Sequence, residues 1–431
     1  MTTESLSKIT TSKVNNKIVI GMTGKMDSVA VAYLLKKQGL EPIAVSVINL
    51  EKMMGKKEIK DGAIDRFVSA DISITGSCHI ENLNSIKNIC DQLGIPFYAT
   101  SAKDAFREDV LGRLITSRLS GEKFSPCISC HRLIIQTLIE KAKELDAPKI
   151  ATGHYAKILS AQQGKQLVVG SSNDVKNDQS YLLAGLQQEE LEKMLLPLSD
   201  MRKSDILRIV ESLGLNFAAS GQKSGDCFTN HPYFEDFLTH MSSRHLRKKG
   251  SVIDFKNDVF IADHHGYHIY TIGQTNLRGF EGNAVDREAI IVDIDPNSGH
   301  IYLGKLFDIT YRLTVLKNFV ADKFLDQSRP KEAYVKFNPH DEAIPCTIFF
   351  RTFNICVIQF KLKQYGRAPS GKIAVLYSRS GPGSKVLGHG QVASYSPFEN
   401  MERLYETIDM ADPVETVRNN KAKEDNLKLR F

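Results

Sequence analysis

Short hydrophobic runs alternate with stretches of helical spacing between Lys17 and about Ala156. The runs predict β-strands at 18–20, 43–48, 96–99 and 149–151, and helices are expected from about 29 to 38, at about 81–93 and at about 131–145. Strands that alternate with helices form a parallel sheet covered by helices, and such sheets bind ligands at the carboxyl ends of their strands. The first part of the chain is therefore expected to be an α/β domain with a ligand site after its first strand.

The hydrophobic spacing changes in the second half of the chain. Residues 177–220 have helical spacing with polar interruptions. From about Gly250, short runs predict strands at 252–255, 267–272, 289–294 and 301–303. Six further runs of alternating polarity follow between Tyr311 and Ala393 and predict a small antiparallel β-barrel.

These patterns divide the chain into three expected domains, in keeping with its length of 431 residues. An N-terminal α/β domain with a parallel sheet is followed by a small central domain and a C-terminal antiparallel β-barrel. Their expected ranges are 17–220, 221–284 and 285–396, after a polar, loose N-terminus at 1–16. The remaining residues, 397–431, lack a clear apolar face and are expected to form a peripheral helix or a partly disordered tail.

The composition is that of a soluble globular protein with a sizeable core, because 42% of the residues are hydrophobic and 25% are charged. A formal net charge of +6 permits a polyanionic partner without requiring one. The first residues, MTTESLSKITTSKVNNK, have neither the apolar core of a signal peptide nor an Arg-rich pattern, and no apolar run approaches about 18 residues. We therefore expect a cytoplasmic protein without a membrane partner.

Seven cysteines are too few for a disulfide scaffold, so clustered ones are expected to be ligands or catalysts. Cys127 and Cys130 lie three residues apart just before a predicted helix, where a pair can bind a metal, ligate an iron–sulfur cluster or support redox exchange. A pair of buried structural cysteines is the alternative. Cys227 lies in another turn of small residues, KSGDCF. The other four are expected in the hydrophobic core: Cys78, Cys90, Cys346 and Cys356.

The segment KIVIGMTGKMDS, residues 17–28, joins the first predicted strand to the first predicted helix through a turn that contains two glycines. Unpaired N–H groups at the start of a helix bind anions where the backbone can come close. Asp27 and Ser28 suit the helix cap and could also hold a magnesium-bound pyrophosphate. The segment fits neither the Walker pattern nor the dinucleotide-binding glycine pattern. It resembles the SGGxDS pyrophosphate loop of enzymes that split ATP between the α and β phosphates.

Six motifs follow one another between Lys17 and Ala393: GMTGKMDS, CISCHRLI, ATGHYAKI, NDQSYLLAGL, KSGDCF and HIYTIGQTNLRG. Together they resemble the tRNA-specific 2-thiouridylases, which thiolate the wobble uridine of certain tRNAs. The corresponding stretches of that family include GMSGGVDS, KDQSYFL and YTIGQRRG. The resemblance implies a pyrophosphate-loop ATP-binding domain, a central domain that contacts tRNA and a C-terminal barrel.

The resemblance also implies roles for individual residues. The loop that would bind ATP comprises Gly21, Met22, Thr23, Gly24, Lys25, Met26, Asp27 and Ser28, with Val47 at the adenine and Gly153 also at the nucleotide. Residues implied beside the target base are Ser125, Pro126 and Cys127, and those implied along the tRNA are His154, Asn177, Asp178, Gln179, Lys336, Phe337 and Lys372. Cys130 would be the catalytic nucleophile, and Cys227 would carry the persulfide.

The resemblance implies ATP with Mg²⁺, and it implies tRNA and a persulfide-relay protein as partners. A basic run at 244–249, RHLRKK, could contact tRNA phosphates or be a solvated charged turn. The residues leave two alternative functions open. One is an RNA-binding paralogue with weakened or retargeted catalysis, and the other is a small-molecule ligase of the same ATP-splitting superfamily.

Two departures from the family pattern bear on these alternatives. Lys25 replaces the second glycine of the loop, and a side chain at a position that needs positive φ would cost roughly 1 kcal/mol or more. The lysine could instead add a charge against phosphate. Cys127 stands where some relatives have Asp, so Cys127, Cys130 and Cys227 could bind a [4Fe–4S] cluster with one open iron. The sulfur carrier is therefore either a persulfide or a cluster-bound sulfide.

Overall fold

The structure is a computed structural model that describes residues 15–49, 56–60, 63–68, 83–161, 166–214, 234–242, 248–275, 277, 279–282, 286–322, 325–351, 354–366 and 368–393. The chain forms two compact units. Unit 1 comprises residues 1–111, 126–234 and 381–385, and unit 2 comprises residues 112–125, 235–380 and 386–431. The tail predicted at 397–431 lies outside the described residues.

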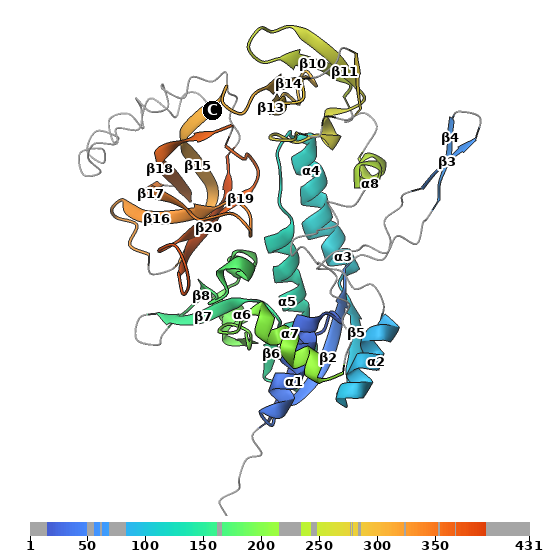
Figure 1. The fold of residues 1–431 in the computed structure, drawn as a ribbon, viewed down its shortest axis with the longest axis vertical. Coiled ribbons are helices and arrows are strands. Elements are labelled where there is room, and N and C mark those ends of the chain that lie inside the picture. The colour runs from blue at the N-terminus through green and yellow to red at the C-terminus, as the bar shows by residue number, and fades with distance from the viewer. Residues whose placement is uncertain are drawn as a thin grey trace, which may run out of the picture. The chain divides into compact units, whose positions relative to one another are not determined.

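A five-stranded parallel sheet forms the centre of unit 1 (Figure 1). Its strands, in the order β5-β2-β1-β6-β9, are β1 (Lys17–Gly21), β2 (Glu41–Ile48), β5 (Phe97–Ser101), β6 (Lys149–Ala151) and β9 (Met194–Leu195). Every neighbouring pair is parallel, which confirms the predicted α/β fold. The chain moves outward from β1 to β5 and returns on the other side of β1. The strand order therefore reverses between β1 and β6, and sheets of this kind bind ligands at that point.

Helices cover both faces of this sheet. They are α1 (Met26–Lys37), α2 (Leu83–Leu93), α3 (Lys103–Phe106), α5 (Cys127–Glu144), α6 (Gln188–Glu192) and α7 (Lys203–Ser212), with a π-helical turn η1 (Arg107–Gly112) and 3₁₀ turns η2 (Val175–Asn177) and η3 (Ser180–Leu183). Ile18 and Ile20 of β1 pack with buried residues of α1, α2 and α7. Val19 points to the opposite face because side chains alternate along a strand, and α5 packs against β1, β2 and β6.

Two helical predictions in unit 1 are wrong in extent. α5 begins at Cys127 and not near 131, because Pro126 has helical dihedral angles and its carbonyl accepts the N–H of Cys130 at 2.9 Å. The described part of 177–220 contains short turns and two helices instead of a mainly helical stretch. One reason is Asp178, whose carboxylate accepts the backbone N–H of Ser172 at 2.9 Å and thereby competes with helical hydrogen bonding.

Two hairpins of unit 1 were not predicted from the sequence. They are β3 (Lys56–Lys60) with β4 (Ala63–Val68), and β7 (Ala156–Ala161) with β8 (Gln166–Ser171). Both lie between elements of the parallel sheet and add antiparallel pairs outside it. They leave the strand order of the sheet unchanged.

Unit 2 contains a second five-stranded sheet in the order β12-β11-β10-β14-β13. Its strands are β10 (Gly250–Asp254), β11 (Phe260–His264), β12 (Phe280–Gly282), β13 (Ile290–Ile294) and β14 (Ile301–Gly304), and the helices of the unit are α4 (Arg113–Leu119) and α8 (Phe234–Met241). The strand predicted at 267–272 is wrong, because this segment begins with the 3₁₀ turn η6 (Tyr267–Ile269). Tyr267 and Tyr270 are both buried in one core cluster, and a spacing of three residues suits a turn and not an alternating strand.

A closed antiparallel barrel forms the remainder of unit 2, as predicted. Its strands are β15 (Thr310–Ala321), β16 (Lys331–Lys336), β17 (Ile344–Arg351), β18 (Ile355–Tyr365), β19 (Ile373–Tyr377) and β20 (Val386–Val392), and the ring runs β15-β18-β17-β16-β19-β20. Cys346 and Cys356 are fully buried in its core, and Cys90 is fully buried in unit 1. These three cysteines are core residues as predicted, whereas Cys78 lies outside the described residues.

Within the described ranges, no helix is both long enough and apolar enough to cross a bilayer.

Candidate active site

The loop between β1 and α1 has its left-handed residue at Gly24, where φ is +75°. A Cβ at this position would lie 2.7 Å from Cγ1 of Ile86, so both the backbone and the space require glycine. Lys25 has φ −89° and ψ 159°, an extended conformation that any residue adopts. The backbone strain expected at Lys25 is therefore absent, and this departure from the family pattern does not deform the loop.

The loop is closed by the hydroxyl of Ser28. Ser28 Oγ donates to the carbonyl of Lys25 at 2.9 Å and accepts the N–H of Thr23 at 3.2 Å. The prediction that Asp27 and Ser28 cap the helix is wrong, because the N-cap is Lys25 and it makes no side-chain cap hydrogen bond. Asp27 and Ser28 instead occupy the first turn of α1, where the N-terminal end of the helix dipole favours negative charge.

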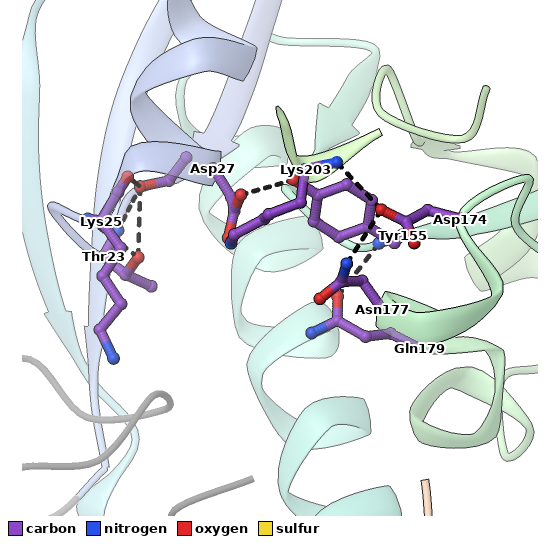
Figure 2. A network of polar contacts seen from close by, with 9 residues as sticks. Thr23, Lys25, Asp27, Tyr155, Asp174, Asn177, Gln179 and Lys203 are labelled. Atoms are coloured by element: carbon purple, nitrogen blue, oxygen red, sulfur yellow. Dashed lines mark hydrogen bonds and ion pairs between the residues drawn. The ribbon is translucent and has the colours of Figure 1, made fainter. Parts of the chain in front are cut away.

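Asp27 contacts two side chains from distant parts of the sequence (Figure 2). The hydroxyl of Tyr155 donates to Asp27 Oδ1 at 2.7 Å, and the ammonium of Lys203 lies 2.5 Å from Asp27 Oδ2. Lys203 Nζ also lies 5.4 Å from the centre of the Tyr155 ring, within cation–π range. Burial, together with the neighbouring Asp27 carboxylate, raises the pKa of Tyr155, so its hydroxyl stays protonated and donates.

Gly153, at the end of β6, brings the second strand-end loop against the first turn of α1. A Cβ at Gly153 would lie 3.0 Å from Cβ of Asp27 and 3.2 Å from the backbone nitrogen of Ser28. The two loops that flank the reversal of strand order therefore approach each other closely because residue 153 has no side chain. Val47 lies near the carboxyl end of β2 and is 9% exposed.

The segment 174–179 holds Tyr155 and Lys203 in place (Figure 2). Gln179 exchanges two hydrogen bonds with the backbone of Tyr155, at 3.0 and 2.7 Å. Asp174 accepts the backbone N–H of Lys203 at 2.9 Å and the amide of Asn177 at 2.9 Å. Burial would raise the pKa of Asp174, but these hydrogen bonds outweigh it and lower the pKa below its usual value. Three of the predicted RNA contacts, Asn177, Asp178 and Gln179, are thus engaged within unit 1.

Two predicted reactive cysteines lie in the first turn of α5. Cys127 is partly exposed and Cys130 is buried, and the amide Nδ2 of Asn49 donates to Cys130 Sγ at 3.7 Å. Cys227 lies outside the described residues. Within the described ranges, no group of three or more His, Cys, Asp or Glu side chains is placed to hold a metal ion. Ser125 and Pro126 lie directly before α5, so the segment implied at the target base leads into this helix.

His154 continues the polar cluster from β6 toward α5. Its Nε2 lies 2.8 Å from Nδ1 of His131, and its Nδ1 lies 2.8 Å from the hydroxyl of Thr152. Burial, with His131 beside it, lowers the pKa of His154 well below its usual value, so this ring is neutral at pH 7. A neutral imidazole donates from one nitrogen and accepts at the other, which both contacts allow.

The predicted tRNA contacts of the barrel lie at the end of β16 and before β19. Lys372 Nζ donates to Oδ1 of Asn338 at 2.6 Å, and Lys336 Nζ lies 5.6 Å from the ring of Tyr377. Burial lowers the pKa of Lys372. Burial and the nearby positive charge of Lys372 together lower the pKa of Lys123 to about 8. Phe337 is buried, and its N–H donates to Asp341. Of the basic run at 244–249, only Lys248 and Lys249 are described.

Three residues of this site were missed in the sequence: Asn49, Tyr155 and Lys203. Tyr155 lies within the ATGHYAKI motif, so its position was available although its contact with Asp27 was not. Asn49 follows a predicted strand, which placed it at the ligand-binding edge of the sheet. Lys203 lies 176 residues from Asp27, and no local pattern marks it.

Comparisons with known proteins match both units. Residues 16–231 match the family described as tRNA methyl transferase HUP domain, and residues 235–305 match the tRNA methyl transferase PRC-barrel domain. The chain is 31% identical to the tRNA-specific 2-thiouridylase MnmA 1 of Caldanaerobacter subterraneus subsp. tengcongensis over 336 residues, which are 77% of this chain and 87% of that protein.

Two further relatives bear the same name. The tRNA-specific 2-thiouridylase MnmA of Clostridioides difficile is 28% identical over 328 residues, which cover 75% of this chain and 85% of that protein. The protein of that name from Desulforamulus reducens is 27% identical over 382 residues, which cover 88% of this chain and 97% of that protein. The similarity therefore extends through the second sheet into the barrel.

Proposed function

The chain belongs to the family of tRNA-specific 2-thiouridylases, and we propose that it uses ATP to replace the 2-oxygen of a tRNA wobble uridine with sulfur. The observation that carries this proposal is the Asp27–Tyr155–Lys203 network at the reversal of strand order between β1 and β6. A cation and a helix N-terminus meet there beside a glycine-bearing loop, an arrangement that suits the phosphates of a nucleotide.

In the first step, O2 of uridine attacks the α-phosphorus of ATP. The bond from this phosphorus to the bridging oxygen breaks, pyrophosphate leaves with the bond electrons, and the N3 proton of the base passes to solvent. The loop from Gly21 to Ser28 would bind the pyrophosphate through its backbone N–H groups, with Gly153 and Val47 at the rest of the nucleotide. Lys203 would supply positive charge to the phosphates. Each oxygen of Asp27 accepts one hydrogen bond and keeps a second lone pair, so Asp27 could also hold a Mg²⁺ ion that enters with ATP.

In the second step, a persulfide on Cys227 attacks C2 and AMP leaves with the C2–O bond electrons. The Cys130 thiolate then attacks Sγ of Cys227, which breaks the S–S bond, leaves the outer sulfur on C2 and forms a Cys130–Cys227 disulfide. An external thiol reductant restores both cysteines, and a persulfide-relay protein reloads Cys227. The position of Cys130 at the start of α5 supports this role, because a helix N-terminus favours the thiolate.

A cluster-bound sulfide is the alternative to the persulfide. The described residues supply two of the three proposed ligands, Cys127 and Cys130, on the same turn of α5. With Cys227 as the third ligand, a [4Fe–4S] cluster would supply an open iron that holds sulfide. Iron and sulfide analysis of anaerobically purified protein distinguishes the two routes.

We propose that the tRNA contacts lie on both units. Ser125, Pro126 and Cys127 would flank the target base, and His154 with the segment 177–179 would contact the RNA near it. Lys336, Phe337 and Lys372 would contact the tRNA from the barrel, where the buried Lys336 and the half-buried Lys372 would supply positive charge to a polyanion. A cytoplasmic location is also proposed, since the substrate is tRNA.

Mass spectrometry of tRNA nucleosides tests the proposed function. Purified protein, ATP, a sulfur donor and unmodified tRNA should yield 2-thiouridine, and omission of ATP should abolish it. The RNA-binding paralogue loses the support that Lys25 gave it, because Lys25 has ordinary backbone angles. Formation of no 2-thiouridine with any tRNA would refute the proposal.

A further inference from the structure

Asn49 lies directly after β2 and is buried, with 5% of its surface exposed. Its Nδ2 donates to Cys130 Sγ at 3.7 Å, so one end of the carboxamide is held against the proposed nucleophile. Its Oδ1 is also buried, and none of the described residues donates a hydrogen bond to it. The active site thus contains an acceptor with no donor from the described chain.

A buried amide oxygen without a donor is unusual, because losing hydrogen bonds to water without replacement costs free energy. At a reaction site, a ligand can bring the missing donor and remove that cost when it binds. The ligand must then carry an N–H or O–H group close to the atom that meets Cys130. This requirement restricts the chemistry of the ligand.

We propose that Asn49 reads the target base by accepting a hydrogen bond from N3–H of uracil at its Oδ1. The inference rests on the proposed function and names the contact by which the site selects uridine. In uracil, N3 is a donor and is bonded directly to C2, the atom that receives sulfur. Because Oδ1 and Nδ2 belong to one planar carboxamide, a base held on Oδ1 through N3–H lies beside the sulfur on Nδ2. Of the two ring carbons bonded to N3, the reaction requires C2 to face that sulfur.

The same contact excludes the other pyrimidine. N3 of cytosine is an acceptor, so it would face Oδ1 of Asn49 without a hydrogen between them. In 3-methyluridine a methyl group replaces the donor and has the same consequence. A site built to pair with a substrate N–H rejects analogues that lack it, because its own polar group is left unpaired. Asn49 is therefore a specificity-determining residue.

Anticodon stem-loop RNAs that differ only in the wobble base provide the test. Dissociation constants of the full-length protein are measured with uridine, cytidine and 3-methyluridine at that position. The wild type should bind the uridine RNA about tenfold more tightly than the other two, the effect of one unpaired group. Asn49→Ala should bring the three constants within about twofold of one another, through weaker binding of the uridine RNA.

Two further variants separate base reading from a structural role. Asn49→Asp keeps an oxygen acceptor in the same shape, so it should retain the preference for uridine while its thiolation rate falls with the loss of Nδ2. Asn173→Ala is the matched control, because this exposed asparagine of unit 1 donates its side-chain amide to Asp200 at 2.9 Å, and the variant should retain the wild-type preference. Thermal unfolding checks each variant, and Asn49→Ser replaces Asn49→Ala if the latter does not fold.

A folded Asn49→Ala protein that still prefers uridine as strongly as the wild type would overturn the inference. Equal binding of the three RNAs by the wild type would overturn it as well. Nucleoside mass spectrometry distinguishes failure of the inference about Asn49 from failure of the proposed function. If the wild type forms 2-thiouridine and Asn49→Ala keeps its base preference, only the role of Asn49 is wrong.

Discussion

Lys203 Nζ lies 2.5 Å from Oδ2 of Asp27, although 176 residues separate them in the sequence. Asp27 is the second residue of α1, and Lys203 is the first residue of α7, which packs against α1. The pair is only partly buried, so solvent weakens its direct effect on stability. The pair instead determines position, because it holds a cation beside the loop that we propose binds the nucleotide.

Asp27→Ala should abolish ATP-dependent thiolation and leave tRNA affinity nearly unchanged, since Asp27 orients Tyr155 and Lys203 and does not meet RNA in our proposal. Lys203→Ala should lower kcat/KM for ATP by about a hundredfold, as expected for loss of a charge-assisted contact. Activity assays and RNA binding on the same preparations provide both measurements. Arg208→Ala, an exposed change on α7, is the control and should be neutral. Full activity of Asp27→Ala would contradict the proposal that the protein is an ATP-dependent thiolating enzyme.

Gly24→Ala and Lys25→Gly should both lower the free energy of unfolding, and for Lys25→Gly this is the opposite of what the family pattern predicts. Gly24→Ala should reduce the free energy of unfolding by about 1–2 kcal/mol or more, because φ is +75° and the new Cβ meets Ile86. Lys25→Gly should reduce it by about 0.5–1 kcal/mol and not raise it, since no strain is relieved and glycine adds entropy to the unfolded chain. Chemical denaturation measures both. A stabilised Lys25→Gly would show that Lys25 is strained after all.

Anaerobic purification should distinguish the two sulfur carriers. If a cluster is present, the protein contains iron and sulfide, and Ala at Cys127, Cys130 or Cys227 removes both the cluster and thiolation. If Cys127→Ala keeps full activity without iron while the other two variants are inactive, the two-cysteine persulfide route stands. Cys90→Ala serves as a chemical control, because burial raises the pKa of Cys90 to about 11 and keeps its thiol unreactive.

The protein should lose stability as the pH falls from about 7 to 5, in part through His154. Its pKa is lowered in the folded state, so the unfolded state binds the extra proton below the usual value of about 6.5. A single proton contributes at most about 1.4 kcal/mol per pH unit to this slope. His154→Gln keeps hydrogen-bonding groups without titrating and should flatten the slope. Unfolding free energies measured at several pH values test this prediction. Parallel slopes for the variant and the wild type would contradict it.

Lys372→Ala should weaken tRNA binding and lower the salt slope by about one unit if the ammonium meets a phosphate. The triple change of Arg247, Lys248 and Lys249 to Ala tests the basic run in the same assay. Lys256→Ala, whose exposed side chain pairs with Asp308, is the matched control in unit 2. An unchanged salt slope for either variant would mark those lysines as structural or solvated residues.

The parallel sheet and the barrel could be predicted because their strands carry local hydrophobic runs. The loop that we propose binds phosphate could also be located, since strand, glycines and helix lie within one short segment. The backbone conformation of Lys25 could not be predicted, because it depends on Gly24 taking the left-handed angles in the folded loop. Tyr267 and Tyr270 misled the strand prediction, since an apolar run in a tight turn has the composition of a strand.

The contacts between residues of the active site could not be predicted from local sequence patterns. Lys203 has no sequence neighbour that marks it, and its role follows only from the packing of α7 on α1. Asn49 gave a weak signal as a polar residue at the end of an apolar strand, but its hydrogen bond to Cys130 depends on the position of α5. Sites built at the edge of a parallel sheet collect residues from every strand, so spacing along the chain cannot reveal them.

The absent side chain at Gly153 also has a consequence for how the protein is made. The loop after β1 reaches its final environment only when Gly153 has docked against Asp27 and Ser28. A nascent chain that has emerged only as far as β5 carries the whole loop that we propose binds phosphate, yet β6 and Gly153 have not emerged. The proposed nucleotide site thus cannot be complete until β6 pairs with β1, and a truncated product that ends before β6 lacks Gly153 and the residues that follow it.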